Sequence, residues 1–530
     1  MFAPRTSPAF LPIEKPLVSF SGGQRDRDHP SLLNPNEYAK GINVEIREAG
    51  LAQTRRGWQK KTDDLGSQLQ GAIFFDPPDQ SERLVVAMGG QFWEWQGSGT
   101  AWTRIGLTQL NNVNERVSFV ALNGTLLAFC GADDNVKSWN GSDPDFTDRG
   151  NTNTDPPRGN IAWIQANRVC CAGVESTATL TNAQPYVFYS DILGPTVWNR
   201  SGNNTRIPTK YDEAVTAGAT YRKQEILVWT RGSTHKIDIS GATVSSFTRE
   251  TLDDSVGCVA PDSVSVVGED AFFVSADRNL RTIKRTINDI AYGVSTPITA
   301  ENPNLMGRIK KTKVQNSVGI FNDNYYLLGA PMDASDTVNE VIPFDMLHQK
   351  QSTAGVIPVC LGEWTNINAG KWVQTYFSGI PQLYFLDSLT GAACLMFERD
   401  TDDNSEIPIT INLRAEDFGS PDHDKTMHSV HIQVLDTFGN FDLSYARDGD
   451  ASFSAFYTDL QISDPNSVNL PVNLPFDLPV GGILDEVYAR FHRKGRSKYW
   501  QLQIHHTDGR INIKFITMRA FIEMMNTRAT

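Results

Sequence analysis

Oxygen-bearing side chains alternate along the segment Asp400–Glu406, which is the nearest approach in this sequence to a metal-binding pattern. Asp400, Asp402, Asn404 and Glu406 occupy every second position. A calcium loop gathers such hard oxygen ligands around one ion, but it also requires a glycine at its sixth position and a glutamate at its twelfth. Both are missing here. We therefore expect a solvated acidic turn and no metal site in this segment.

The histidines also lack the spacing of metal ligands. His423, His428 and His431 cluster near the start of an expected strand, and His505 and His506 are adjacent. Because successive side chains of a strand point to opposite faces, His505 and His506 cannot both bind one ion. We expect surface or hydrogen-bonded histidines without a ligand role.

Motifs for nucleophilic catalysis and phosphate binding give no support for an enzyme. The sequence has neither a Walker loop nor a G-x-S-x-G elbow. The segment Tyr189–Trp198 resembles the Asp-box turn of sialidase-like proteins, although Ser190 and Asp191 are adjacent instead of separated by one residue. Such boxes are structural turns. The sequence thus predicts no catalytic, cofactor-binding or metal-binding residue, and a protein that is not an enzyme.

The elements that would have to position any site repeat along the chain. Each repeat has an apolar strand, a turn, a second apolar strand and often a turn rich in Trp, Asn and Gly. A period of roughly 40–50 residues made of hairpins is typical of a β-propeller, and six or seven blades fit the length. We therefore expect an all-β protein in which most tryptophans fill the space between blades. The repeats are found at Leu84–Trp102, Phe119–Ser142, Ile226–Ala242, Ala271–Ile283, Tyr325–Asp345 and Gln382–Arg399.

Composition indicates a folded, acidic protein. Of the 530 residues, 40% are hydrophobic and 21% charged, which suits a packed core. The net charge of −13 disfavours binding of nucleic acid, because a negatively charged protein repels phosphate. The six cysteines lie mostly in apolar strands and are expected to be buried free thiols. No signal peptide and no apolar run of about eighteen residues is visible, so we expect no membrane-spanning helix.

Basic residues are concentrated near the beginning of the chain. This surplus could contact an acidic partner surface, but we expect a solvated basic segment. Its members are Arg25, Arg27, Arg55, Arg56, Lys60 and Lys61.

Changes in texture predict four parts. Residues 1–16 read as an extended arm, 17–61 as one segment of a platform domain, 62–420 as the propeller, and 421–530 as a terminal antiparallel β-sandwich that completes the platform. Both strand-rich ends are expected to combine into one β-domain, with the propeller inserted between them. The Pro-rich segment Asp464–Gly482 has no periodicity and is expected to be a long loop.

The segment Ser19–Trp58 resembles the opening of propeller-bearing tail proteins of tailed bacteriophages. In that group a Gly-Gly start leads to an N-P-N-E-Y stretch, an Asn before a strand, and then a Gly followed by R-x-G. The blade segment Leu383–Gly391 and the terminal strands of Arg490–Ala520 are also similar to this family. The residues that carry the resemblance are Gly22, Gly23, Asn34, Pro35, Asn36, Glu37, Tyr38, Asn43, Gly50, Arg56 and Gly57.

The resemblance implies a structural virion protein, made in the cytoplasm of the host bacterium, that forms the nozzle or hub ring at the distal tail of a short-tailed phage. Such a ring, commonly a homohexamer, continues the DNA channel below the portal and adaptor and anchors fibres or spikes. The implied partners are further copies of the chain, adaptor or portal-proximal proteins, fibres or spikes, and genomic DNA that passes without specific binding. The loop Asp464–Gly482 would line a gate or clasp a neighbour.

Two other functions remain open from the residues alone. A propeller can present a glycan-binding face for host recognition without a reaction. It can also carry a glycoside hydrolase or depolymerase site, which would need converging carboxylates in a funnel at the propeller axis.

Overall fold

The computed structural model describes residues 10–17, 19–46, 50–78, 80–177, 180–209, 211–241, 243–284, 296–352, 355–435, 440–450, 452–461, 484–490, 495–507 and 509–523. Within these ranges the fold is all-β, as expected. The described helices are short: η1 (Pro30–Leu32), η2 (Val244–Ser246), η3 (Pro261–Ser263), α2 (Pro303–Gly307), η4 (Val314–Asn316) and η5 (Phe377–Gly379). None of the described helices is long and apolar enough to cross a membrane.

Seven small antiparallel sheets follow one another along the chain. The first two contain β7 (Leu69–Phe75), β8 (Arg83–Met88), β9 (Gln91–Trp95) and β10 (Thr103–Arg104), then β11 (Ser118–Leu122), β12 (Thr125–Phe129), β13 (Lys137–Trp139) and β14 (Thr147–Asp148). The third and fourth contain β15 (Ile161–Gln165), β16 (Arg168–Ala172), β17 (Tyr186–Asp191), β18 (Gly194–Trp198) and β19 (Asn204–Arg206), then β20 (Val215–Arg222), β21 (Glu225–Thr230), β22 (Thr234–Asp238) and β23 (Thr248–Asp253). The fifth contains β24 (Ser265–Val267), β25 (Asp270–Val274) and β26 (Leu280–Thr282).

The last two sheets complete this series. The sixth contains β27 (Val318–Asn322), β28 (Tyr325–Ala330), β29 (Glu340–Ser352) and β30 (Gly355–Cys360). The seventh contains β31 (Ala369–Thr375), β32 (Gln382–Asp387), β33 (Ala393–Arg399) and, from the beginning of the chain, β6 (Gly57–Lys60). The register of β6 on β33 pairs Trp58 with Met396 and Lys60 with Cys394.

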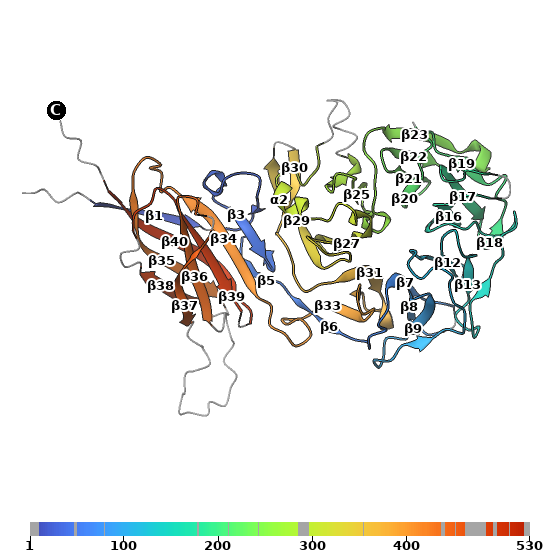
Figure 1. Ribbon diagram of the computed structural model, residues 1–530, viewed down its shortest axis with the longest axis horizontal. Coiled ribbons are helices and arrows are strands. Elements are labelled where there is room, and N and C mark those ends of the chain that lie inside the picture. Colours follow the sequence, from blue (N-terminus) through green and yellow to red (C-terminus); the bar gives the residue numbers. More distant parts are fainter. Residues whose placement is uncertain are drawn as a thin grey trace, which may run out of the picture.

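Contacts between the first strands of these sheets run in a closed cycle. Each of β7, β11, β15, β20, β24, β27 and β31 contacts the next, and β31 contacts β7 again. In Figure 1 the sheets surround a common centre at the right of the molecule. We call this part the seven-sheet ring.

The two ends of the chain form a second unit, which we call the terminal sandwich (left in Figure 1). One six-stranded sheet contains β38 (Leu484–Arg490), β35 (Lys425–Leu435), β40 (Asn512–Glu523), β5 (Ala52–Thr54), β4 (Val44–Ile46) and β1 (Phe10–Leu17). The other contains β2 (Gly23–Gln24), β3 (Glu37–Ile42), β34 (Ile409–Glu416), β39 (Trp500–His506), β36 (Asn440–Arg447) and β37 (Ser454–Gln461). Both sheets bury side chains in one common core, which also takes in Val359 of β30 and Leu361 directly after it.

Burial along single strands explains why some strands are continuous apolar runs and others alternate between apolar and polar residues. In β8, every residue of Arg83–Met88 is buried, because a strand inside the ring packs on sheets at both faces. In β35, buried and partly exposed residues nearly alternate, because one face of the sandwich sheet meets the core and the other meets solvent. Trp95, Trp139, Trp198, Trp229, Trp364 and Trp372 are buried, which confirms the expected core role. All six cysteines are buried and free, also as expected.

Sheet membership differs from the expected boundaries at three points. The expected arm 1–16 contains most of β1, which pairs with β40 over its whole length. Strand β6 lies in the seven-sheet ring and not in the platform segment 17–61, and β34 lies in the terminal sandwich and not in the propeller segment 62–420. Each difference has the same cause. The strand pairs with a partner that is more than a hundred residues away, and the local sequence pattern cannot predict which partner that is. The segment 464–482 lies outside the described residues.

Candidate functional site

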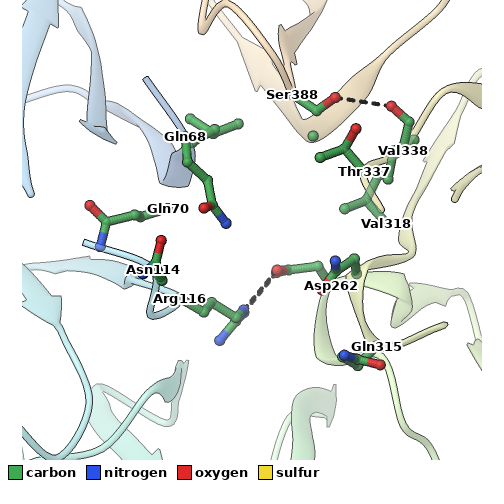
Figure 2. Close-up of a pocket in the computed structure, with 13 residues that line it drawn as sticks. Gln68, Gln70, Asn114, Arg116, Asp262, Gln315, Val318, Thr337, Val338 and Ser388 are labelled. Atoms are coloured by element: carbon green, nitrogen blue, oxygen red, sulfur yellow. Dashed lines mark hydrogen bonds and ion pairs between the residues drawn. The ribbon is translucent and has the colours of Figure 1, made fainter. Parts of the chain in front are cut away.

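A polar cavity lies between the first strands of the seven-sheet ring. Its volume is about 130 Å³. Figure 2 shows side chains from strands of the first and sixth sheets and from segments next to the second, fifth and seventh sheets around it. Amides and hydroxyls dominate this lining, and no hydrogen bond joins the side-chain amide of Gln68 or Asn114 to another described residue. The labelled lining residues are Gln68, Gln70, Asn114, Arg116, Asp262, Gln315, Val318, Thr337, Val338 and Ser388.

A cluster of three charged residues ties the ring together beside this cavity. Arg116, just before β11, donates from Nε and Nη2 to the two carboxylate oxygens of Asp262 in η3, both at 2.7 Å. Lys371 of β31 forms a second ion pair with the same carboxylate. Arg116 also donates to the carbonyl of Asn160, before β15. One carboxylate thus links segments of the second, fifth and seventh sheets.

The charges of this cluster suit binding or structure better than proton transfer. Burial alone would raise the pKa of Asp262, but Arg116 and Lys371 outweigh burial and hold the pKa well below its usual range. Asp262 is the one carboxylate among the described residues that line the cavity. A carboxylate held ionised between two cations cannot donate a proton at neutral pH. The volume of the cavity is well below that of a typical ligand site, so the cavity can hold only a small polar group or ordered water.

Several of the residues that carry the resemblance lie elsewhere, at the junction between the two units. Gly23 has φ +66°, and a β-carbon there would lie 2.2 Å from Cγ1 of Val359. Tyr38 is fully buried and its hydroxyl donates to the carbonyl of Leu361 at 3.0 Å. Glu37 pairs with Lys350 of β29 at 3.2 Å. A glycine is required at position 23, because the φ is positive and the backbone of β30 approaches too closely for a side chain.

A second part of the junction is a buried ion pair. Arg55 donates from Nη1 and Nη2 to the two oxygens of Asp402 at 2.8 and 2.6 Å, and the side chains are 0% and 3% exposed. Asn43, at φ +55°, accepts from Nε of Arg55 and from the backbone of Thr365, both at 2.9 Å. Asn43 also donates to the carbonyl of Pro408 at 2.7 Å. Both oxygens of the carboxylate are bound by the guanidinium, and Nε of Arg55 is bound by Asn43, so the buried charges have the hydrogen-bond partners that they require.

A third part gathers carboxylates around Arg308. Its guanidinium contacts Asp333 at 2.8 Å, Glu340 at 3.2 Å and Glu363. Lys40 of β3 reaches Glu363 at 3.5 Å, so the cluster joins the sandwich to the sixth sheet. Burial, followed by the charge of Glu363, raises the pKa of Glu340 to about 7, although Arg308 opposes the shift.

These contacts correct two expectations from the sequence. The expected solvated acidic turn is wrong for Asp402, which is buried against Arg55. The expected solvated basic segment is wrong for Arg55, which is buried, whereas Arg27 is exposed as expected. Arg25 pairs with Asp28 and Glu37, Lys60 pairs with Asp64, and Arg56 lies over the ring of Phe397 at 4.9 Å. Arg55 and Asp402 are 347 positions apart, so no local signal in the sequence could have joined them.

The remaining candidates have ordinary partners. His428 contacts Ser429 and the ring of Phe521, and His423 contacts Ser420. His506 is buried and His505 partly exposed, which confirms that they point to opposite faces. Among the described residues, no three His, Cys, Asp or Glu side chains are placed to hold a metal ion.

The Asp-box-like segment forms the β17–β18 hairpin. Its Ser190 hydroxyl accepts from the backbone of Val169 at 2.9 Å, and the Trp198 indole donates to the carbonyl of Pro195 at 2.8 Å. The first bond joins the hairpin to the neighbouring strand β16 and the second closes the turn, so both side chains have structural roles.

Comparison with known proteins assigns no family. No protein-family model and no curated protein matches the chain. Solved structures that resemble it include an ancestral GH74 enzyme (10% identity, TM-score 0.40, covering 73% of this chain and 52% of that one). Others are the extracellular domain of a one-component system from B. thetaiotaomicron (11%, 0.39, 66% and 41%) and PorZ of the type-IX secretion system of Porphyromonas gingivalis (10%, 0.37, 71% and 44%). The chain spans less than two thirds of each of these three proteins, and similarity at this level carries no functional argument.

Proposed function

We propose that the seven-sheet ring is a seven-bladed β-propeller and that the protein is a structural component of a bacteriophage tail. In this proposal it forms a nozzle or hub ring, commonly of six copies, at the distal end of the tail. One observation carries the proposal: several residues of the resemblance lie at the junction between the terminal sandwich and the ring. Gly23 packs closely on Val359 at the end of β30, Tyr38 donates to the carbonyl of Leu361, and Asn43 donates to Thr365 and to the carbonyl of Pro408, just before β34.

The topology supports an assembly role for the terminal sandwich. The first and last described strands, β1 and β40, pair with each other in one of its sheets, so the seven-sheet ring is inserted between two parts of the sandwich. The sandwich sheets end in strands such as β37, whose outer backbone groups can pair with another chain. Contacts between copies are therefore proposed at the sandwich, and contacts to fibres or spikes at the propeller.

The size of the central cavity bears on where DNA would pass. A cavity of about 130 Å³ that is lined by the Arg116–Asp262 pair cannot admit a duplex. A DNA channel would have to form between copies, below the portal and adaptor. The net charge of −13 favours a wall along which DNA slides without being held.

Mass photometry of the purified full chain tests this proposal. We expect particles of six times the 58.8 kDa chain mass, with adaptor protein added where a template is needed. Particles of 58.8 kDa alone, at every concentration and with adaptor present, would contradict ring formation. Genes for a portal and an adaptor beside the coding sequence would support the tail assignment independently.

A propeller hydrolase is less well supported. It would need a pair of carboxylates at the axis, one of them protonated. The axial cavity offers Asp262, which is ion-paired twice and whose pKa is lowered.

A further inference from the structure

A second polar cavity, of about 260 Å³, lies at the edge of the fourth sheet and is separate from the axial one. Three segments form it: the link from β19 to β20, the turn from β21 to β22, and the end of β23. The lining is rich in hydroxyl and carboxylate groups. It consists of Pro208, Thr209, Tyr211, Glu213, Gly232, Ser233, His235, Thr251, Asp254 and Ser255.

A chain of hydrogen bonds fixes the floor of this cavity. Thr230 donates its one hydroxyl proton to Oε2 of Glu213 at 2.7 Å. The hydroxyl of Ser233, 2.7 Å from that of Thr230, must then donate to it, and His235 must donate from Nε2 to Ser233 at 2.7 Å. The Nδ1 atom of His235 is left to accept from Thr251 at 3.2 Å. Burial lowers the pKa of His235 to about 4, which keeps the ring neutral and this direction of donation fixed at neutral pH.

With the donors and acceptors of this chain fixed, one oxygen of Glu213 and the hydroxyl proton of Thr209 remain for a ligand. Oε2 of Glu213 accepts from Thr230 and from the backbone of Gly232 at 3.2 Å. No described residue donates to Oε1, so this oxygen can accept a hydrogen bond from a ligand hydroxyl. The backbone of Glu213 donates to the hydroxyl of Thr209 at 2.9 Å, which leaves the Thr209 proton for an acceptor on the same ligand.

Tyr211 adds an aromatic surface at the rim. The residue is 76% exposed and lines the cavity beside Glu213. Two carboxylates, Glu213 and Asp254, line the cavity, so an anionic ligand is disfavoured. A flat ring next to hydroxyl donors and carboxylate acceptors suits a molecule with one apolar face and several hydroxyl groups.

We propose that this cavity, which we call the fourth-sheet site, binds one neutral sugar ring of a glycan. Glu213 accepts from ring hydroxyls, Thr209 donates, and Tyr211 packs on the apolar face of the ring. A volume of about 260 Å³ is below that of a typical drug-sized site, so one ring enters and the rest of a glycan lies outside. The inference does not depend on ring assembly, because the site lies within a single chain.

Saturation-transfer NMR and calorimetry on the full chain test the site. The probes are glucose, galactose, mannose and N-acetylglucosamine, with sialic acid as the anionic probe and glucosamine as the cationic one. We expect at least one neutral sugar to bind with a Kd of about 1–10 mM and sialic acid not to bind. Tyr211→Ala and Glu213→Gln should each weaken binding about five- to tenfold.

Tyr376→Ala is the matched control, because Tyr376 is also an exposed tyrosine but lines a different cavity. It should leave sugar binding unchanged, and thermal melts should show that all three variants remain folded. Absence of binding by all four neutral sugars, binding by glucosamine alone, or equal binding by the wild type and both site variants would each overturn the proposal. None of these results would alter the particle mass, so failure here is distinguishable from failure of the proposed function.

Discussion

At the residue scale, Arg55 and Asp402 neutralise each other at a place where their side chains are only 0% and 3% exposed. Arg55→Met should lower the free energy of unfolding by about 3–5 kcal/mol, since it leaves Asp402 charged and buried without its partner. Urea unfolding followed by tryptophan fluorescence measures this loss.

The control for this prediction is an exposed ion pair. Arg519 and Glu14 lie 3.0 Å apart with both side chains 52% exposed. Arg519→Ala should change the free energy of unfolding by less than about 1 kcal/mol. Similar losses for Arg55→Met and Arg519→Ala would contradict the role given to the buried pair.

A second test at this scale uses Gly23. Comparison with Gly66, which has a similar φ, separates the cost of a steric clash from the cost of a positive φ. Gly23→Ala should destabilise the protein by about 2–4 kcal/mol, since the new methyl group would lie 2.2 Å from Val359 at a φ of +66°. Gly66 has a φ of +68° and open space around its β-carbon position. Gly66→Ala should therefore cost only about 1 kcal/mol, and equal melting temperatures for the two variants would show that the close approach at Gly23 is not limiting.

Sequence could identify part of this junction but not its chemistry. The glycines and the Asn-Pro-Asn-Glu-Tyr stretch stand out as a short pattern, and the resemblance draws attention to Tyr38 and Asn43. Their partners, such as Leu361 and Thr365, lie more than 300 positions away. The fourth-sheet site was missed for the same reason: Glu213, Ser233 and His235 show no motif spacing until three segments fold together.

At the element scale, Asp262 holds three sheets of the ring by one carboxylate. Asp262→Asn should lower the free energy of unfolding by about 2–4 kcal/mol, because Arg116 and Lys371 would then face each other without a counter-charge. Asp336→Asn is the control, since Asp336 is an exposed partner of Lys310 and Lys313. A melting temperature for Asp262→Asn that matches that of Asp336→Asn would rule out a stabilising role at the axis.

The cluster around Arg308 should make the junction sensitive to pH. The pKa of Glu340 is about 7 in the folded chain, above its ordinary value of 4.5, so the folded state binds a proton more tightly than the unfolded state. The stabilisation is complete below pH 4.5 and is lost as the pH rises through about 7. Glu340→Gln should remove up to about 3 kcal/mol of this pH dependence.

Urea unfolding of the wild type and Glu340→Gln between about pH 5 and pH 8 measures the difference. Titrating groups elsewhere in the chain affect both proteins alike, so the comparison isolates Glu340 together with the carboxylates around Arg308. Parallel pH profiles for the two proteins would contradict the assignment.

Much of the element pattern follows from sequence, because hairpins are local. The apolar runs at Leu84–Met88 and Tyr325–Ala330 are strands in the structure. Placement of β6 and β34 does not follow, because each pairs with a strand far along the chain. Periodicity reports which face of a strand is buried, and it does not report against which partner.

At the scale of the whole molecule, the chain is a two-unit body whose smaller unit holds both ends (Figure 1). The junction between the units is held by buried contacts. In the proposed assembly, contacts between copies at the terminal sandwich would therefore leave the seven-sheet ring closed.

Cryo-electron microscopy of the purified full chain tests this account most directly. The account predicts closed rings of about six copies in which terminal sandwiches surround a central channel and the seven-sheet units project outward. Rings whose channel is lined by the seven-sheet units, or fields that contain only separate molecules even with adaptor present, would contradict it.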